Sequence, residues 1–376
     1  MKNRPELSVV LPAQDEEKAI GQCLKQIKEV LAENSINGEI IVSDSSTDKT
    51  AEIAKSMGVK VICHGLNGYG RALLKGFNQA SGQFIFMADA DGSYDFRLIP
   101  DFLNEIKNKN LDLVIGNRFA GQIESNAMPT LHRYLGRIIF SNLSLLFFGQ
   151  KVNDIHCGMR MIRANTLTKL NLKTSGMEFA SEMIVKAFRQ SLKLGQLPIN
   201  YQPRLGQSKL KSARDGWRHL RFMLLYSPNF LFLLPGFIMF TLGIVTLVLL
   251  YFKKIALAGI VFQYHPMFVA SLLVIIGYQL IIFSVFAKIY AHLNLNEKDD
   301  LIEYGLKHLS LEKSLLIGSI PLLAGILIFI VVLYDWLIAG LGELNAADSL
   351  IIGLTLIAVG TQTIFSSFML SIIGIK

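Results

Sequence analysis

The sequence predicts an α/β domain at the N-terminal end, followed by an α-helical membrane domain. Short apolar runs alternate with amphipathic helical patterns through residues 1–210, as in a doubly wound sheet. After residue 228 the sequence changes to four long uncharged runs. The whole chain is 51% hydrophobic and has a mean hydropathy of +0.41, too apolar for an ordinary soluble protein. The predicted domains are residues 1–210, an amphipathic helix at 211–228 and a membrane domain at 229–376.

In the first domain, each predicted strand is a short apolar run bounded by polar or glycine-containing turns. The predicted strands are Leu7–Leu11, Glu39–Ser43, Val59–Ile62, Phe84–Ala88 and Leu111–Gly116. Helical patterns separate them, at Glu16–Ala32, Asp48–Met57, Tyr69–Ala80 and Leu98–Lys107. This alternating order predicts a parallel sheet with helices on both faces.

The second half of the chain predicts four transmembrane helices. Four runs lack Asp, Glu, Lys and Arg and are long enough to cross a bilayer: Asn229–Phe252, Pro266–Ala287, Ser314–Tyr334 and Ser349–Ile375. We place the helices at about 229–252, 266–290, 314–337 and 349–375, with a loop at 291–313. The sequence therefore describes a multi-pass integral membrane protein.

Positive charges near the spans predict the orientation. Arginines and lysines are concentrated before the first span, in and around the 291–313 loop, and at the C-terminal Lys376. The first connection carries only Lys253 and Lys254, and the third carries neither Lys nor Arg. By the positive-inside rule, we expect the N-terminal domain, the middle loop and the C-terminus to be cytoplasmic.

Two amphipathic segments are expected at the membrane surface. In the first, an apolar stripe lies opposite a basic one, formed by Trp217, Leu220 and Leu224 against Arg214, Arg218 and Arg221. The second is Leu301–Leu311, and packing in a protein core is the alternative for both. The formal charge of +8 fits contact with an anionic membrane. No basic stripe interleaved with aromatics is present, so nucleic acid is not an expected partner.

The most informative short motif follows the predicted strand at Phe84–Ala88. Asp89 and Asp91 are expected on the same side at its C-terminal end, because side chains alternate along a strand. Ligands bind at this edge of α/β sheets, and paired carboxylates with substrate phosphates suit Mg²⁺ or Mn²⁺. A solvated acidic turn is the alternative.

Polar turns also follow the other predicted strands, at Pro12–Glu16, Asp44–Asp48 and Asn67–Arg71. Taken alone, Asp44–Asp48 is equally typical of a helix N-cap, and the glycine pair Gly68 and Gly70 of an ordinary turn. Together with the Asp89 turn, they indicate a nucleotide site along one sheet edge.

Three arginines are candidates for binding phosphate, because planar guanidinium groups suit phosphate oxygens. Arg118 lies just past a strand end, and Arg133 and Arg137 are one helical turn apart on a predicted helix at Thr130–Phe148. The alternative for the last two is an ordinary basic helix face. His132 and His156 are expected to be solvated or packed in the core.

The motifs resemble a known family. Leu11-Pro12-Ala13-x-x-Glu16, Asp44-x-Ser46-Thr47-Asp48 and Asp89-Ala90-Asp91-Gly92 resemble those of the inverting family-two glycosyltransferases, which have the Rossmann-like GT-A fold. Four further motifs are similar to those of the dolichol-phosphate mannose synthase branch and its bacterial polyprenyl-phosphate relatives. These are Gly116-Asn117-Arg118-Phe119, Asp154-x-x-Cys157-Gly158-Met159-Arg160, Gly176–Glu182 and Pro203-Arg204-x-Gly206-x-Ser208-Lys209-Leu210. The resemblance covers about residues 6–235.

This resemblance implies roles for particular residues. The donor would be bound by Pro12, Glu16, Asp44, Arg71 and Asp89, and the metal on its diphosphate by Asp89 and Asp91. The phosphate chemistry of the arginines, rather than the resemblance, assigns the acceptor phosphate to Arg118, Arg133 and Arg137. The predicted catalytic residues are Asp91, Arg118 and Arg133. Glu178 and Glu182 also match the family, although a helix N-terminal turn explains them equally well. The sequence departs from the usual pattern at Gln14, Asp15, Ser43 and Ser93, which leaves the donor base and sugar open.

The predicted function is transfer of one sugar from a nucleotide diphosphate sugar (GDP-mannose or a UDP-hexose) to undecaprenyl or dolichyl phosphate. The reaction would invert the anomeric centre, with Mg²⁺ or Mn²⁺, at the cytoplasmic membrane face. One alternative is a processive polysaccharide synthase, which would need a Gln-x-x-Arg-Trp motif that this sequence lacks. Another is a non-catalytic membrane protein that senses nucleotide sugar. The sequence does not decide whether the protein forms a homo-oligomer.

Overall fold

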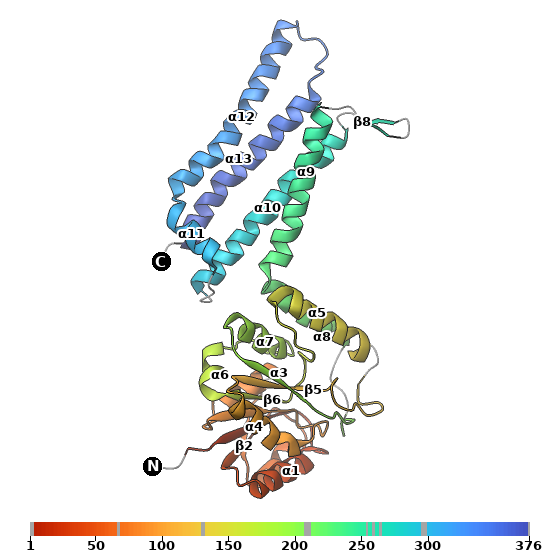
Figure 1. Ribbon diagram of the computed structural model, residues 1–376, viewed down its shortest axis with the longest axis vertical. Coiled ribbons are helices and arrows are strands. Elements are labelled where there is room, and N and C mark those ends of the chain that lie inside the picture. The colour runs from red at the N-terminus through yellow and green to blue at the C-terminus, as the bar shows by residue number, and fades with distance from the viewer. Residues whose placement is uncertain are drawn as a thin grey trace. The chain divides into compact units, whose positions relative to one another are not determined.

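The computed structural model describes residues 4–65, 68–128, 132–206, 212–252, 255–257, 260–262, 265–294 and 299–374. The chain divides into two compact units, Met1–Tyr226 and Ser227–Lys376. Each unit is described by itself, and the elements of both are labelled in Figure 1.

Unit 1 is built on a seven-stranded sheet with the strand order β3-β2-β1-β4-β6-β5-β7. Its strands are β1 (Leu7–Ala13), β2 (Gly38–Asp44), β3 (Lys60–Cys63), β4 (Phe84–Met87), β5 (Leu113–Asn117), β6 (Arg160–Arg163) and β7 (Leu194–Pro198). Its α-helices are α1 (Ile20–Glu33), α2 (Thr50–Ser56), α3 (Tyr69–Phe77), α4 (Ile99–Asn108), α5 (Arg137–Phe148), α6 (Ala164–Leu170), α7 (Phe179–Arg189) and α8 (Ser212–Leu225).

The sheet is mixed, so the prediction of a wholly parallel sheet is wrong at one strand. β3, β2, β1 and β4 are parallel, whereas β6 runs antiparallel to both β4 and β5. β6 has no local signal because arginines stand at both of its ends. Arg160 is fully buried, and its guanidinium donates to the backbone carbonyls of Ile155, Cys157 and Ala180 at 2.6–2.8 Å. Two of these carbonyls precede Arg160 by three and five residues, and the third, from Ala180, lies on α7. Backbone groups carry no sequence signal, so the pattern of side chains does not show why a charged residue is buried here.

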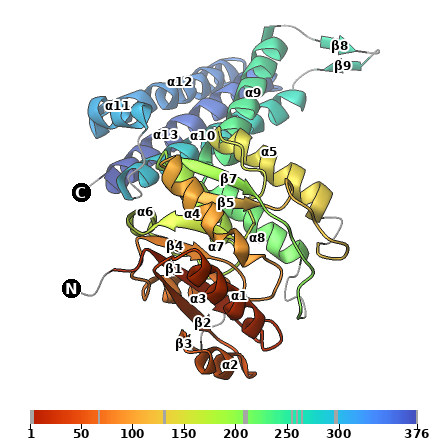
Figure 2. The same ribbon diagram turned by 60° about the horizontal axis from the view of Figure 1, so that its bottom comes forward.

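Helices cover both faces of the sheet, as predicted. Val10 on β1 faces α3, where a Cβ atom at Gly76 would come within 2.4 Å of a Val10 methyl group. Phe86 on β4 pairs with Val9, the residue before Val10 on β1, and therefore faces the opposite side. There it packs edge-to-face against Phe102 of α4, with ring centroids 5.5 Å apart. Figure 2 shows these elements around the sheet.

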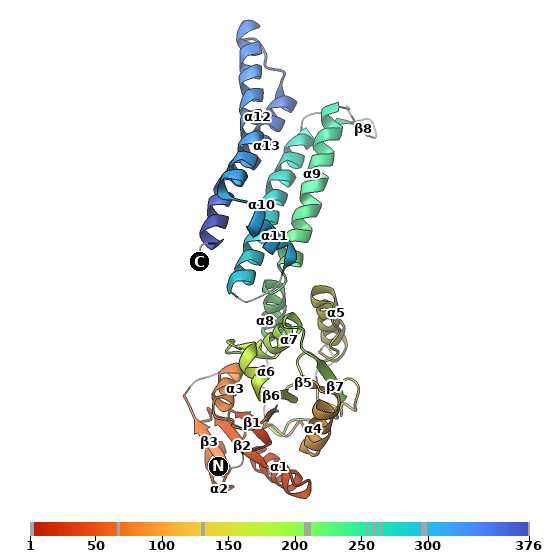
Figure 3. The same cartoon turned by 60° about the vertical axis from the view of Figure 1, so that its left-hand side comes forward.

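Unit 2 contains the four predicted helices that are long and apolar enough to span a membrane. They cover Asn229–Phe252, His265–Leu293, Leu311–Ile338 and Ala347–Ile373. The elements are η3 (Asn229–Leu233), α9 (Leu234–Phe252), β8 (Ile255–Leu257), β9 (Ile260–Phe262), α10 (His265–Asn294), α11 (Asp300–His308), α12 (Leu311–Ile338) and α13 (Ala347–Gly374). Figure 3 shows α9 beside α10, and α12 beside α13, as two hairpins.

The two hairpins are packed through the same pattern of glycines. Gly236 and Gly243 of α9 face α10, and Gly318 and Gly325, with the same spacing, face α13 from α12. A Cβ atom on the central glycine of α10 or α13 would lie 2.4 or 2.5 Å from a backbone nitrogen of the facing helix. Both facing helices continue with the same residue types at the same spacing: Gly277, Gln279 and Ser284 on α10, and Gly360, Gln362 and Ser367 on α13. The second hairpin therefore repeats the first, and close backbone approach holds each one together.

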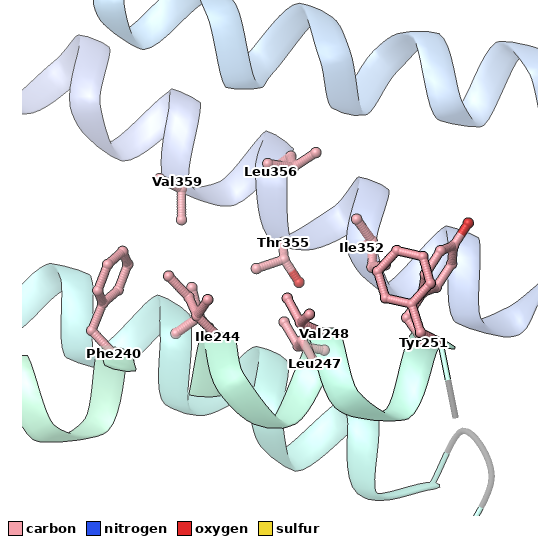
Figure 4. A pocket seen from close by; sticks show the side chains of 11 residues that line it. Phe240, Ile244, Leu247, Val248, Tyr251, Ile352, Thr355, Leu356 and Val359 are labelled. Carbon is pink, nitrogen blue, oxygen red and sulfur yellow. The ribbon is translucent and has the colours of Figure 1, made fainter. Parts of the chain in front are cut away.

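The hairpins meet along α10 and α13. The hydroxyl groups of Ser271 and Thr355 lie 2.7 Å apart, and those of Tyr278 and Thr363 lie 2.5 Å apart. Beside this contact, α9, α10 and α13 surround a cavity of about 280 Å³ whose lining is almost entirely apolar (Figure 4). Unit 2 thus combines tight glycine contacts with space for an apolar group.

Candidate functional site

The turns after β1 and β2 are joined by hydrogen bonds. The Asp15 carboxylate accepts hydrogen bonds from the backbone nitrogen of Thr47 at 2.8 Å and from its hydroxyl at 3.1 Å. Asp15 itself has a φ of 49°, and its backbone N–H donates to the Ser46 hydroxyl at 2.7 Å. The same hydroxyl donates to Asp44 at 2.6 Å. The two turns therefore form one rigid rim at this edge of the sheet.

Three of the four candidate donor-binding residues outside the Asp89 turn lie along this rim. Pro12 and Asp44 occupy the ends of β1 and β2, and Glu16 lies in the turn between β1 and α1. The helix predicted from Glu16 starts only at Ile20, so the nearly buried Glu16 side chain can face the sheet edge. Arg71, by contrast, has an exposed side chain in the first turn of α3.

The glycine pair at the start of α3 has a packing role. A Cβ atom at Gly68 or Gly70 would come within 2.3 Å of a backbone carbonyl oxygen in residues 174–175. That segment is fixed by Glu182, which accepts hydrogen bonds from Lys173 and Thr174 at 2.6–3.1 Å. The glycines thus permit close approach of another loop, and Glu182 holds that loop.

Asp89 and Asp91 lie together beyond the end of β4. The strand ends at Met87, one residue before its predicted end, so both carboxylates lie in the segment that follows the strand. Within this segment Gly92 has a φ of 80°. The Asp91 carboxylate accepts hydrogen bonds from the Ser93 backbone nitrogen at 3.0 Å and from its hydroxyl at 2.5 Å. Ser93 therefore orients Asp91.

The surroundings of Asp89 fit a divalent cation. Its Oδ1 atom is buried and has no hydrogen-bond partner among the described residues. Burial, and then the negative charge of Asp91, raise the pKa of Asp89 to about 7, while a hydrogen bond from the Tyr69 hydroxyl lowers it. A Cβ atom at Gly158 would come within 2.7 Å of Oδ2, so a glycine there leaves room for the carboxylate. The described residues hold no cluster of three His, Cys, Asp or Glu. A cation here would need further ligands from phosphate or water, as Mg²⁺ usually does.

Arg118 is fixed in place at the end of β5. Its Nε and Nη2 atoms each donate to Asp154 at 2.7 Å, forming a bidentate ion pair with side chains only 12% and 2% exposed. The guanidinium carbon also lies 5.0 Å from the centroid of the Tyr201 ring. Its positive charge acts to lower the pKa of Asp89, so the structure brings Arg118 near the carboxylate pair. The sequence contained Asp154 within a motif but gave it no role.

The other two arginines follow a different geometry from the predicted one. A π-helical turn, η2 (His132–Gly136), precedes α5, so the prediction of one regular α-helix over Thr130–Phe148 is wrong in its first turn. Arg133 is exposed in that turn, with its guanidinium 5.8 Å from the Tyr134 ring centroid. Arg133 and Arg137 are therefore not one regular α-helical turn apart. Thr130 and the side chain of Arg137 lie outside the described residues, as does the side chain of His132.

His156 packs in the core of unit 1. Its ring centroid lies 4.0 Å from that of His219 on α8 and 4.6 Å from that of Phe140 on α5. Of the two surroundings expected for His156, solvent or the core, the structure shows packing against these rings, and the contact joins α8 to the rest of the unit.

Arg204 lies at the candidate site, although no role was predicted for it. Its Nη2 atom lies 3.0 Å from a carboxylate oxygen of Glu16 and 3.4 Å from one of Asp91. Its side chain is 24% exposed, and it connects the β1 turn with the β4 turn. The motif around Arg204 indicated that this segment matters, but a contact between residues 16 and 204 leaves no local pattern in the sequence.

Two family profiles match the chain. "Glycosyl transferase family 2" matches residues 8–170, which contain the turns described above. "Glycosyltransferase family 2 C-terminal transmembrane region" matches residues 285–374, which contain the second hairpin.

Similar proteins extend these matches over nearly the whole chain. The low-salt glycan biosynthesis hexosyltransferase Agl6 of Haloferax volcanii is 36% identical over 370 residues, covering 98% of this chain and 89% of that protein. The dolichyl-phosphate hexose transferase of the same organism is 31% identical over 211 residues, covering 56% of this chain and 89% of that protein. A solved mycobacterial protein shares the fold with a TM-score of 0.50 and 20% identity, covering 60% of this chain and 75% of the other. The chain belongs to glycosyltransferase family 2 and is a glycosyltransferase with the transmembrane region of that family.

Proposed function

We propose that this glycosyltransferase transfers one hexose from a nucleotide diphosphate sugar to a polyprenyl phosphate. The donor is GDP-mannose or a UDP-hexose, and the acceptor is undecaprenyl or dolichyl phosphate. The observation that carries the proposal is the carboxylate pair Asp89 and Asp91 beside the clamped Arg118. Support also comes from the names of the two Haloferax relatives, a hexosyltransferase and a dolichyl-phosphate hexose transferase.

The donor is assigned to the rim formed by the first two βα turns. Pro12, Glu16 and Asp44 contact the base and ribose, because they occupy neighbouring strand ends at the carboxyl edge of the sheet. The hydrogen bonds through Asp15 hold this rim in shape before the donor arrives. Arg71 provides an exposed positive charge for the donor at the start of α3.

The diphosphate leaving group is assigned to the turn of Asp89 and Asp91, and these two carboxylates would hold Mg²⁺ or Mn²⁺. When bound, such a cation would stabilise the negative charge that develops on the departing diphosphate. Ser93 fixes the orientation of Asp91, and Gly158 leaves the space that Asp89 occupies. Asp91 would thereby contribute to catalysis by holding the cation that stabilises the leaving group.

The acceptor phosphate is assigned to the arginines. The second pKa of a phosphate monoester is about 6, so a lipid phosphate is largely a dianion near neutral pH and needs no strong general base. It does need positive charge that is already oriented, and the bidentate bond to Asp154 orients Arg118. Arg133 and Arg137 supply additional positive charge to the same phosphate. Attack from the face opposite the leaving diphosphate inverts the anomeric centre.

The membrane unit is assigned the task of holding the enzyme where the lipid lies. Its four apolar helices suit a bilayer, and the positively charged flanks favour a cytoplasmic N-terminal domain and C-terminus. The segment 211–228 would lie at the membrane surface, with Trp217 58% exposed on α8. The apolar cavity between α9, α10 and α13 can receive part of a lipid chain.

The test is to identify the lipid product. The purified full-length protein in liposomes is offered GDP-mannose and several UDP-hexoses, with undecaprenyl and dolichyl phosphate, and the lipids are analysed by mass spectrometry. We expect one acceptor to gain the mass of a single hexose with one preferred donor, and chelator to stop the reaction. A ladder of products would instead identify a processive synthase. No lipid product with any donor would contradict the proposal.

A further inference from the structure

A short segment after β7 packs on the turn that contains Asp89 and Asp91, here called the acidic turn. The backbone nitrogen of Gln202 donates to the carbonyl of Ser93 at 3.0 Å, and that of Leu205 donates to the carbonyl of Asp91 at 3.0 Å. The Leu205 side chain covers Gly92, where a Cβ atom would lie 3.0 Å from a Leu205 methyl group. Arg204, between these two backbone contacts, is thus held at the mouth of the proposed metal site.

The guanidinium of Arg204 compensates one carboxylate from each of two turns. Its Nη2 atom lies 3.0 Å from Glu16 and 3.4 Å from Asp91, two residues that are only 8% and 6% exposed. Its Nε atom is buried and has no hydrogen-bond partner among the described residues. One cationic side chain therefore balances part of the negative charge of Glu16, assigned to the ribose, and of Asp91, assigned to the divalent cation.

We propose that Arg204 takes the place of the divalent cation when the donor is absent, so that the cation binds strongly only together with the nucleotide. The inference rests on the proposed function, because it takes Asp91 as a metal ligand. A cation that enters alone must break the contact between Arg204 and Asp91, and it then lies next to a guanidinium whose positive charge only Glu16 still balances. A nucleoside diphosphate brings the negative charge that lets both positive charges remain.

The contact is suited to being displaced. The Arg204 side chain is 24% exposed, and Nη2 is shared between two acceptors, so solvent screens the ion pair. If Arg204 weakens the binding of the cation alone but not of the cation with nucleotide, it strengthens the coupling between the two ligands. By linkage, the affinity for nucleotide then rises with cation by the same factor. Couplings between two ligands typically amount to about 5- to 150-fold in affinity. We expect about tenfold here.

The experiment measures Mn²⁺ affinity by electron paramagnetic resonance, with the full-length protein in detergent, alone and with UDP or GDP. In the absence of nucleotide, Arg204→Gln should bind Mn²⁺ about tenfold more tightly than the wild type, because the competing charge is gone. With the nucleotide that binds, the difference should shrink to about twofold or less. Arg97→Gln is the matched control, because the exposed Arg97 pairs with Asp95 and the variant has the same change of net charge. It should leave Mn²⁺ affinity unchanged.

Arg204→Lys separates charge from folding of the segment. It keeps the positive charge, so its Mn²⁺ affinity without nucleotide should stay close to that of the wild type. If Arg204→Gln binds Mn²⁺ no better than the wild type, or if Arg204→Lys behaves like Arg204→Gln, the inference is wrong. Either result would leave the proposed function standing, provided Mn²⁺ binds in the presence of nucleotide. Failure of the wild type to bind Mn²⁺ with UDP and with GDP would overturn both.

Discussion

The two units use opposite means to bring chain segments close together. Unit 1 buries charged side chains and satisfies them with fixed partners: Asp154 holds Arg118, and Arg160 donates to three backbone carbonyls. Unit 2 has glycines where its helices meet, and residues such as Gly277 and Gly360 let the helix backbones approach closely. Buried, oriented charge suits electrostatic catalysis, whereas close backbone contact suits helices in a medium without water. The difference assigns the chemistry to unit 1 and the attachment to the membrane to unit 2.

The repeat in unit 2 strengthens this comparison. A duplicated hairpin with the same glycines provides the same helix packing twice, whereas the candidate site residues of unit 1 follow different strands of one sheet. Variants in the two units should therefore fail in different ways. Changes at the sheet edge should remove activity from a folded protein, and changes in the hairpins should unfold helices without altering donor binding.

The largest effect is expected at the acidic turn. Asp91→Asn should abolish transfer, because losing one carboxylate from a metal–diphosphate site costs several kcal/mol, about 3 kcal/mol or more, of leaving-group stabilisation. Rates of the purified variant and its melting temperature are the measurements. Asp101→Asn, an exposed position in the first turn of α4, is the control and should keep its rate. Full activity of Asp91→Asn would rule out its assigned role.

The next largest effect concerns the pair of Arg118 and Asp154. Asp154→Ala leaves a nearly buried guanidinium without its carboxylate, which should destabilise unit 1 by about 3–5 kcal/mol. Arg118→Ala should raise the concentration of lipid phosphate needed for transfer more than that of nucleotide sugar. A double-mutant cycle on unfolding free energy measures the coupling of the pair, expected above about 1 kcal/mol. Additive effects would mean that Asp154 does not hold Arg118 in solution.

A third prediction separates the units physically. Residues 1–226 alone should still bind nucleotide sugar, because the donor turns and Arg204 all lie within unit 1. Transfer to long-chain polyprenyl phosphate should fall by about 10²-fold or more, since tethering at the bilayer raises the effective concentration of acceptor by such factors. Transfer to a short, water-soluble prenyl phosphate should fall much less. Equal losses on both acceptors would show that unit 2 shapes the catalytic site.

The smallest effect on chemistry is expected in the hairpins. Gly360→Leu should destabilise unit 2 by about 1–3 kcal/mol, because even a Cβ atom there would lie 2.5 Å from a backbone nitrogen of α12. Thermal unfolding in detergent would show the loss, while nucleotide affinity stays at the wild-type value. Gly342→Leu, at an exposed position with open space around it, is the matched control. A weakened donor affinity in Gly360→Leu would contradict the division of roles.

Local sequence signals predicted the fold where each element depends on its own residues. β1 and β4 are short apolar runs followed by polar turns, and the four spans are long uncharged runs, so neither needs knowledge of distant contacts. β6 escaped prediction because its buried Arg160 is satisfied by backbone carbonyls, one of them 20 residues away on α7, and backbone groups leave no pattern in the sequence. The same holds for the site. Asp89 and Asp91 adjoin their strand, whereas Asp154 and Arg204 reach it only through tertiary contacts.

The glycine repeat of unit 2 was missed for another reason. Glycines are common in transmembrane helices, so single ones carry little information. Their meaning came from the register of α9 against α10 and of α12 against α13, which places Gly236 opposite Gly277 and Gly318 opposite Gly360. Hydropathy gives the lengths of helices and contains no information about how they face each other.

The central claim is that Asp89 and Asp91 hold a divalent cation together with the donor diphosphate. The most direct measurement is anomalous X-ray scattering from crystals of the protein grown with Mn²⁺ and UDP or GDP. We predict one anomalous peak bound by both carboxylates and by the diphosphate, at oxygen distances of about 2.0–2.2 Å. Well-ordered nucleotide with no Mn²⁺ peak between Asp89 and Asp91, its diphosphate contacted by arginines alone, would contradict the claim.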